Sequence, residues 1–183
     1  MTRTSRDILD EWLVLRCQGR DAEALRELVR RYQPRIWRQA MYLTGRREGA
    51  EEVVQETWLA IVRGLPRLRD PAAFRSWACR IVSRRSADWI RRRQRDRART
   101  DHALDPDEAA DAPDALPAAG DELQKLRRAI RNLPAHLRCV LGMHYQDGLS
   151  VCEIAYALDI PAGTVKSRLH HARNTLRETL ERK

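Results

Sequence analysis

The sequence predicts an all-α protein with two small helical domains joined by a flexible acidic linker, and two observations support this fold class. Apolar residues recur every three or four positions through most of the chain, which is the spacing of one helical face. Residues 99–120 contain almost no large apolar side chain and are interrupted by three prolines: Pro106, Pro113 and Pro117. Such a segment buries too little surface to fold alone. We therefore expect an N-terminal domain in residues 1–95, a linker in 96–120 and a C-terminal domain in 121–183.

The formal net charge of +9 is distributed unevenly along the chain. Residues 1–100 carry a formal charge of +11, residues 101–122 carry −8, and residues 123–183 carry +6. A basic, acidic, basic order is typical of two modules that bind polyanions and are joined by an acidic tether. Nearly all the cations are arginines, which suit bidentate contacts to phosphate and guanine, although a GC-rich genome would also favour them.

Cysteine usage and hydropathy favour a cytoplasmic protein without a metal or other cofactor. The four cysteines are widely separated and form no C-x-x-C pair. A zinc ion would have only a loose set of candidate ligands: His136, Cys139, His144 and Cys152. Buried reduced thiols are therefore the favoured interpretation of the cysteines. No apolar run approaches the roughly 20 residues of a membrane span, so no membrane insertion is expected. No phosphate-binding glycine loop, acid pair or nucleophile is evident, and we expect no enzymatic activity.

Two helices are expected before Gly45. Ser5 can cap a first helix that ends near Gly19, and this helix has three apolar residues at helical spacing: Ile8, Trp12 and Leu15. Asp21 can cap a longer helix that ends at Gly45. Pro34 should kink this second helix rather than end it, because the apolar pattern continues beyond the proline: Leu25, Leu28, Val29, Tyr32, Ile36, Ala40 and Leu43.

A third helix, from Glu48 to Arg63, has two distinct faces. The apolar face is expected to be buried: Ala50, Val53, Val54, Thr57, Trp58, Ile61 and Val62. The opposite stripe combines carboxylates, an amide and a leucine: Glu52, Gln55, Glu56, Leu59 and Arg63. In a basic domain this stripe suggests a docking surface for a basic partner, and an ordinary solvated face with one leucine explains the pattern equally well.

A loop with Arg67 and Arg69 leads to a fourth, long helix, which Asp70 can cap and Pro71 can open. Its core side is expected to be apolar: Phe74, Trp77, Ala78, Ile81, Val82, Trp89 and Ile90. Arginines cover much of the remaining surface, among them Arg80, Arg84 and Arg91. Arginines interleaved with aromatic rings are typical of surfaces that bind single-stranded nucleic acid, although the tryptophans lie at core spacing and are better explained as structural.

Two short helices and a helix-turn-helix are expected in the C-terminal domain. The first short helix ends at Pro134, and the second contains Gly142, which should cost about 1 kcal/mol relative to alanine. Ser150 and Glu153 then form a capping-box pair, and Pro161 lies near the start of the last helix. The buried face of that helix carries Val165, Leu169, Ala172 and Leu176.

The other face of the last helix carries hydrogen-bond donors and no acid: Thr164, Lys166, Ser167, Arg168, His170, His171 and Arg173. A short scaffold helix, a tight turn and a donor-rich helix are what reading of the DNA major groove requires. A helical hairpin with a solvated basic face is the weaker alternative, since the capping box, the turn and the donor face coincide here.

Three segments resemble the extracytoplasmic-function branch of the bacterial sigma-70 family. GLSVCEIAYALDIPAGTVKSRLHHARNTL (148–176) is similar to the domain that reads the minus-thirty-five promoter element. EGAEEVVQETWLAIVRGL (48–65) resembles the segment that docks on core RNA polymerase, and FRSWACRIVSRRSADWIRRRQR (74–95) resembles the segment that melts and reads the minus-ten element. The resemblance implies a sigma factor with core polymerase, promoter DNA and an anti-sigma factor as partners.

The resemblance also implies roles for particular residues. The β′ clamp helices would bind Glu52, Gln55, Glu56 and Leu59, and the β flap is a further expected contact of the polymerase. Minus-ten DNA would contact Arg67, Arg69, Arg80, Arg84 and Arg91. Base edges of the minus-thirty-five element would contact Lys166, Ser167, His170 and His171, with Thr164, Arg168 and Arg173 nearer phosphates. Arg84 stands where many relatives have Asn, and His171 stands where they often have Arg, so base preferences are not carried over.

Two other classes of protein remain as alternatives. A dimeric helix-turn-helix regulator would bind duplex DNA without polymerase, and it would leave the stripe on helix 48–63 unexplained. A zinc-dependent nucleic-acid enzyme would need the loose His and Cys set named above, and metal analysis of the purified protein would test it.

Overall fold

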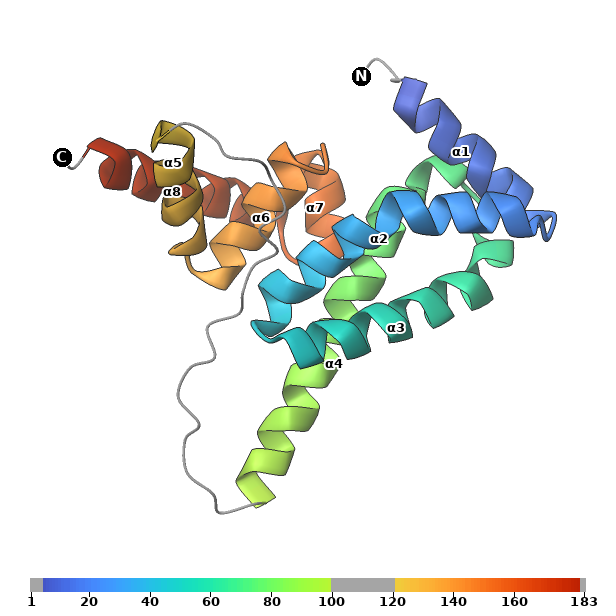
Figure 1. The fold of residues 1–183 in the computed structure, drawn as a ribbon, viewed down its shortest axis with the longest axis horizontal. Coiled ribbons are helices and arrows are strands. Elements are labelled where there is room, and N and C mark those ends of the chain that lie inside the picture. The colour runs from blue at the N-terminus through green and yellow to red at the C-terminus, as the bar shows by residue number, and fades with distance from the viewer. Residues whose placement is uncertain (1–4, 100–120, 182–183) are drawn as a thin grey trace.

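The computed structural model describes residues 5–99 and 121–181, in which every regular element is a helix (Figure 1). The N-terminal group consists of α1 (Ser5–Gln18), α2 (Ala22–Thr44), α3 (Arg47–Gly64), the short 3-10 turns η1 (Leu65–Arg67) and η2 (Pro71–Ala73), and α4 (Phe74–Arg99). The C-terminal group consists of α5 (Asp121–Arg131), α6 (Ala135–Tyr145), α7 (Val151–Leu158) and α8 (Ala162–Glu181). The predicted all-α class is confirmed. Most of the predicted linker lies outside the described residues, and residues 96–99 continue α4.

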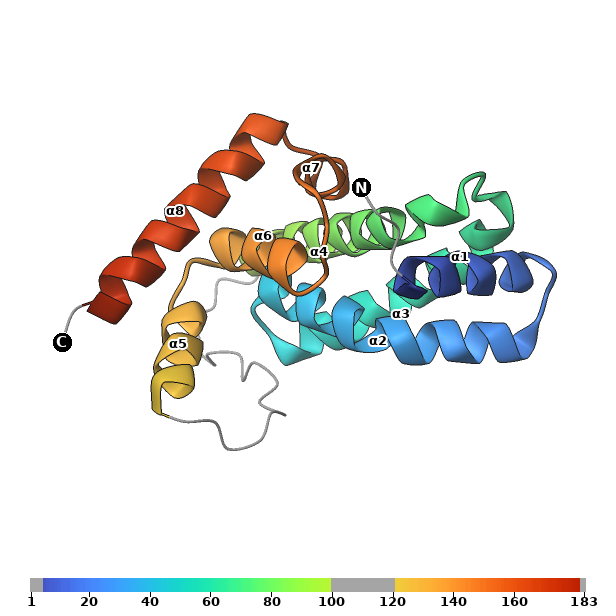
Figure 2. The same ribbon diagram turned by 90° about the horizontal axis from the view of Figure 1, so that it is seen from above.

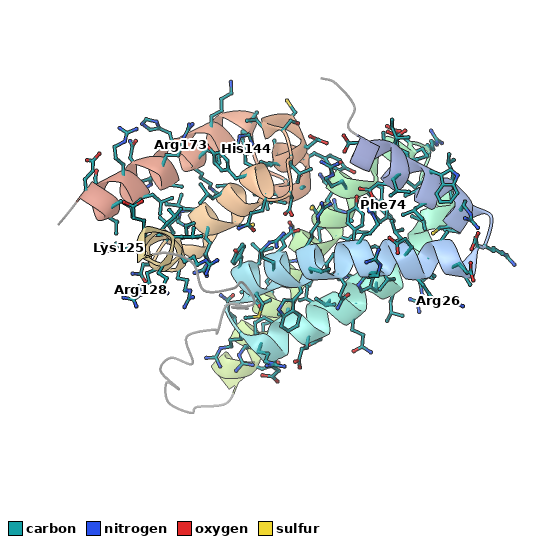
Figure 3. The ribbon with its side chains drawn as sticks, turned by 45° about the horizontal axis from the view of Figure 1, so that its top comes forward. Arg26, Phe74, Lys125, Arg128, His144 and Arg173 are labelled. Atoms are coloured by element: carbon teal, nitrogen blue, oxygen red, sulfur yellow. The ribbon has the colours of Figure 1, made fainter. Side chains whose placement is uncertain are left out.

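Helices α1 to α4 share one apolar core, and the deeply buried Phe74 lies between α1 and α2 (Figure 3). The ring of Tyr32 meets Phe74 edge-on, with centroids 4.9 Å apart and planes at 88°. The Tyr32 hydroxyl donates a 2.6 Å hydrogen bond to the buried carboxylate of Asp10 on α1. Burial and this bond raise the pKa of Tyr32 well above its ordinary value. Arg31 of α2 donates to the other oxygen of this carboxylate at 2.8 Å, so both oxygens of the buried Asp10 are paired and the network fixes α1 to α2.

The helix caps predicted at Asp21, Gly45 and Asp70 are present, whereas Ser5, predicted to cap the first helix, is itself the first residue of α1. Asp21 accepts hydrogen bonds from the amides of Glu23 and Ala24 at 2.9 and 3.0 Å, and Gly45 ends α2 with φ at 66°. Asp70 accepts a 3.0 Å hydrogen bond from the amide of Ala72. The expected helix start at Pro71 is shifted, because this proline opens the 3-10 turn η2 and the α-helix begins only at Phe74.

Two apolar sets are placed differently from a simple helical pattern. Val62 was predicted to be buried, and this is wrong: its side chain is 47 % exposed. Helix α3 packs on α2 and α4 through Val53, Thr57 and Ile61, so a residue one position after Ile61 is turned outward. On α1 the buried apolar residues are Leu13 and Val14, whereas the apolar residues at the predicted helical spacing are exposed: Ile8, Trp12 and Leu15.

Helix α4 has two unlike halves. Up to Ile90 it packs against α2, α3 and the C-terminal group. Beyond Ile90 the described side chains are exposed or, for Arg93, half-buried. Figure 1 shows these last turns extending past α3, away from the other helices.

The C-terminal group surrounds a second core formed by α6, α7 and α8. The predicted capping box is present: the Ser150 hydroxyl accepts from the Glu153 amide at 3.2 Å, and Glu153 accepts from the Ser150 amide at 2.8 Å. Asp159 ends α7 in the left-handed region, with φ at 58°. The turn therefore sets α8 across α7, as Figure 2 shows.

The two groups of helices lie against each other. Helix α7 packs along the first half of α4, and α6 packs against the end of α2 (Figures 1 and 2). No described helix combines the length and the apolar character that crossing a membrane requires.

Candidate nucleic-acid interface

The outward face of α8 is a continuous set of exposed donors. Lys166, Ser167, His170, His171 and Arg173 are exposed, and Thr164 and Arg168 are half-buried. Within the described residues, no cation of α8 forms an ion pair with a carboxylate. This face is therefore open to an anionic partner, as the sequence predicted for a major-groove helix.

Three buried side chains fix the rotation of α8. Val165 and Ala172 have no exposed surface, and Leu169 is 5 % exposed. Because these residues are three or four positions apart, they hold one stripe of α8 on α6 and α7, and the positions between them face outward. The Arg173 Nε donates to the Leu169 carbonyl at 3.2 Å, which keeps its aliphatic stem along the helix (Figure 3).

The arginines predicted to hold single-stranded DNA are divided by the structure. Arg67 and Arg69 are exposed in and after η1, and Arg84 is exposed on α4. Arg91 is exposed and pairs with Asp88 on the same helix. Arg80 is engaged: its guanidinium is 2.9 Å from the Asp159 carboxylate, donates to the Tyr156 carbonyl and covers the Tyr156 ring at 4.4 Å.

The outward stripe of α3 is only partly free. Leu59 is 51 % exposed and Gln55 is also exposed. The two carboxylates face the arginines of α4, with Arg92 2.8 Å from Glu52 and 3.3 Å from Glu56. Arg85 lies 3.7 Å from Glu56 on the other side. These pairs were missed by sequence reasoning, because the crossing of α3 and α4 is not visible in the pattern of either helix.

Val62 is a further exposed residue of this face that sequence reasoning placed in the core. It lies one helical turn from Leu59, and the two side chains are 47 % and 51 % exposed. The three-residue spacing from Leu59 was the available signal. Leu59 and Val62 give α3 an exposed apolar patch, and the polar Gln55 lies one turn before Leu59.

The candidate zinc ligands are spread over different environments. Cys139 is buried, which raises the pKa of its thiol to about 12, and its sulfur lies 3.9 Å from that of Met143. Cys152 is exposed on α7, and the His144 Nδ1 lies 2.9 Å from the Leu149 carbonyl oxygen. No cluster of three or more metal-ligating side chains occurs among the residues that the structure describes.

Two family models match the chain. Sigma-70 region 2 matches residues 28–96, which include α3 and nearly all of α4. Sigma-70 region 4 matches residues 123–176, which include the helix-turn-helix. The two matches follow the two groups of helices.

Curated relatives match over most of this chain. The ECF RNA polymerase sigma factor SigL of Mycobacterium tuberculosis is 36 % identical over 165 residues, covering 88 % of this chain and 91 % of the relative. The ECF RNA polymerase sigma-E factor of Salmonella typhimurium is 30 % identical over 181 residues, covering 94 % of each. SigE of Mycolicibacterium smegmatis is 34 % identical over 162 residues, and this match spans 60 % of that longer relative.

Two solved structures share the fold. The sigma factor RpoE from Bartonella quintana, in complex with the anti-sigma factor NepR, has a TM-score of 0.72 at 22 % identity, covering 88 % of this chain and 99 % of the other. CnrH in complex with the cytosolic domain of CnrY has a TM-score of 0.62 at 23 % identity, covering 94 % of this chain and 97 % of the other.

Proposed function

The chain belongs to the extracytoplasmic-function branch of the sigma-70 family, and from this premise we propose how its surfaces share the work of promoter-directed transcription initiation. It binds core RNA polymerase, reads two promoter elements with two helices and helps to open the duplex. The observation that carries this division is the outward face of α8, a row of exposed donors without an ion-paired acid. The protein acts in the cytoplasm and carries out no covalent chemistry itself.

Helix α8 reads the minus-thirty-five element in the major groove. Lys166, Ser167, His170 and His171 lie where base edges are reached, and Thr164, Arg168 and Arg173 lie nearer the phosphates. The N-terminal half of a recognition helix normally sits deepest in the groove, which supports this assignment. The buried stripe on the opposite side of α8 holds these side chains in a fixed orientation.

The loop after α3 and the exposed side of α4 hold the minus-ten strand. Arg67, Arg69, Arg84 and Arg91 are exposed along this route, and Arg80 lies beside it. Guanidinium contacts to phosphates make binding strongly dependent on salt, because each contact releases counterions.

The outward stripe of α3 docks on the β′ clamp helices of the polymerase. Leu59 gives this stripe an exposed apolar anchor, and Val62 enlarges it. Gln55, Glu52 and Glu56 add polar and acidic groups that suit a basic partner. The C-terminal domain contacts the β flap. An anti-sigma factor is a further partner: of the two solved structures of similar fold, RpoE is bound to the anti-sigma factor NepR, and CnrH is bound to the cytosolic domain of CnrY.

Co-purification with bacterial core RNA polymerase, followed by run-off transcription on genomic fragments, tests the function. The double variant Gln55→Ala with Leu59→Ala should lose most core binding and keep its helical circular dichroism, because truncating an anchor residue costs about 2 kcal/mol or more. Glu23→Ala is the control, since Glu23 is an exposed acid of the same domain that lies on α2, away from the stripe, and its ion pair is with Arg26 on its own helix. Wild-type affinity in the double variant would reject the docking assignment, and sequence-specific DNA binding without any core binding would indicate a conventional regulator.

A further inference from the structure

A hydrogen bond between two side chains lies on the outward face of α8. The amide nitrogen of the Asn174 side chain, Nδ2, is 3.0 Å from Nε2 of the His170 ring. The two residues are four positions apart, so their side chains lie one helical turn apart on the same face. His170 belongs to the set that we assign to base edges, and Asn174 is not in that set.

Other polar side chains of this face bond to the backbone of their own helix. The Ser167 hydroxyl donates to the Thr164 carbonyl at 3.0 Å. The Thr175 hydroxyl donates to the His171 carbonyl, also at 3.0 Å. Within the described part of α8, the hydrogen bond of Asn174 is the one that orients another side chain.

The apolar core does not account for an asparagine at position 174. Asparagine is less favourable than alanine in the interior of a helix, because its side chain competes for backbone hydrogen bonds. Asn174 lies well inside α8, which ends at Glu181. The core on this part of the helix is formed by Ala172 and Leu176, on the opposite side. The contact that the structure gives to the Asn174 side chain is its bond to His170.

This bond fixes which ring nitrogen of His170 carries the proton. An amide nitrogen donates hydrogen bonds and accepts none, so Nε2 of His170 accepts from Asn174. A neutral imidazole has one protonated nitrogen and one bare nitrogen, and the proton is therefore on Nδ1. Since Nδ1 of His170 has no hydrogen bond within the described residues, Nδ1–H is the donor that the ring offers to DNA.

A donor at this position distinguishes bases by their major-groove edges. Guanine presents acceptors at N7 and O6, adenine presents one at N7, and thymine presents one at O4. Cytosine presents only its N4 amino group, which is a donor and forms no hydrogen bond with Nδ1–H. The other tautomer of the ring, with a bare Nδ1, would instead accept from the amino group of cytosine or adenine.

We propose that Asn174 is a positioning residue for base reading. It holds His170 in the tautomer that donates from Nδ1, and the holoenzyme therefore rejects cytosine at the base that His170 faces. This inference rests on the function proposed above and names a specificity determinant of the same surface. Asn174 acts through the ring and does not contact the base itself.

The bond to Asn174 also makes the base preference independent of pH. When the ring gains a second proton, on Nε2, the Asn174 amide turns so that its Oδ1 accepts from Nε2–H. Because Nδ1–H is present in both states, cytosine is rejected in both. The other charged or titratable groups on this side belong to α8 itself, since α5, α6 and α7 pack on its opposite side: Lys166, His171, Arg173, Arg177 and Glu178. Their charges change the affinity for every sequence and cancel in the ratio between two bases.

Promoter binding by holoenzyme tests the role of Asn174. Core RNA polymerase with each protein is titrated on a library randomised in the minus-thirty-five element, at about pH 6 and about pH 8. His170→Ala identifies the base pair that His170 faces, because the preference disappears there. Asn174→Ala and Asn174→Asp are compared with the wild type at that pair. Thr179→Ala is the matched control, since this exposed threonine of α8 bonds to the Thr175 carbonyl at 2.7 Å and not to a side chain.

The wild type and the control should bind the cytosine promoters about tenfold more weakly at both pH values. Asn174→Ala should keep this discrimination at about pH 6, where both ring nitrogens are protonated, and lose most of it at about pH 8, where both tautomers are available. In Asn174→Asp the carboxylate accepts from Nε2–H, so Nδ1 is bare at about pH 8 and the preference should move to cytosine or adenine.

Wild-type rejection of cytosine by both Asn174 variants at both pH values would overturn the positioning role, as would a wild type that accepts cytosine at this pair. A change of preference at a different base pair from the one that His170→Ala identifies would also overturn it, because Asn174 would then read a base itself. If His170→Ala alters no preference, His170 reads no base and the positioning role fails with it. If no holoenzyme of the set forms or selects a promoter, it is the proposed function that fails.

Discussion

The surfaces of α8 and α4 that we assign to DNA differ in what their cations contact. No cation on α8 is ion-paired within the described residues, and its donors face outward from a helix fixed by three buried residues. Two of the three α4 arginines that we assign to DNA already have acidic partners: Arg80 pairs with Asp159, and Arg91 pairs with Asp88. The surface that we assign to duplex reading is therefore open in the free protein, whereas part of the proposed single-strand surface must exchange protein carboxylates for phosphates.

This difference indicates an order of events. A paired guanidinium gives up an existing ion pair before it binds DNA. Its net contribution to the free energy of DNA binding is therefore smaller than that of an unpaired guanidinium. We expect single-strand binding to be weak until polymerase positions the strand, and duplex contacts to form more readily.

The largest expected effect comes from removing the support of α8. Ile154 has no exposed surface, and Ile154→Ala should destabilise the C-terminal domain by about 2–5 kcal/mol, because it leaves a cavity under the helix-turn-helix. All five tryptophans lie between residues 12 and 89, so their fluorescence reports the N-terminal domain alone. Denaturation followed by circular dichroism should show an early phase that tryptophan fluorescence does not follow. Ile154→Val is the milder control, and an equal shift of both signals would show that the domains unfold as one unit.

The next effect separates base reading from phosphate binding on α8. Lys166→Ala should cost about 1–3 kcal/mol on the preferred promoter and relax preference at one base pair. Arg168→Ala should weaken binding to all sequences alike and lower the salt dependence by about one phosphate contact. Binding titrations on a set of minus-thirty-five variants at two salt concentrations measure both. A uniform loss for Lys166→Ala would remove it from the base-reading set.

Arg84 is the exposed α4 arginine for which a change in base preference is expected. Arg84→Asn should shift the preferred base at one minus-ten position by about tenfold or less, because a shorter amide changes the contacts to an extruded base. A randomised minus-ten library transcribed by holoenzyme with each protein measures the shift. Identical preferences with both proteins would place Arg84 outside the base pocket.

The smallest effect is expected at the ion pairs between α3 and α4. Arg92 and Glu52 are 43 % and 44 % exposed, so Arg92→Ala should change the free energy of unfolding by less than about 1 kcal/mol. Chemical denaturation with tryptophan fluorescence is the suitable measurement. A loss well above that value would mean that these pairs hold α3 on α4 and are unavailable to a polymerase.

Local chemistry was predictable from the sequence, and contacts between distant segments were not. The capping box of Ser150 and Glu153 was predicted from two side chains three positions apart, and both of its hydrogen bonds are present. The inward stripe of α8 was likewise predicted from spacing alone. The roles of the individual DNA-binding and polymerase-binding residues stay predictions.

The misplaced residues share a physical cause. Val62 was predicted to be buried because it is an apolar residue beside the buried face of its helix. Whether such a residue is covered depends on the neighbouring helices, and α3 packs against α2 and α4 on the side that carries Ile61. The pairing of Arg38 with Asp147 spans 109 positions of the chain, and no local pattern indicates it. The pairing of Arg80 with Asp159 spans 79 positions and is likewise not indicated by any local pattern.

The unlike halves of α4 have a consequence for hydrogen exchange. Amides up to Ile90 are covered by tertiary packing and should exchange only when the domain unfolds, whereas amides beyond Ile90 should exchange by fraying at little cost. Protection should therefore decline along one unbroken helix. A helix end that opens so easily can change its backbone course to follow a bound strand, while the packed half keeps its position.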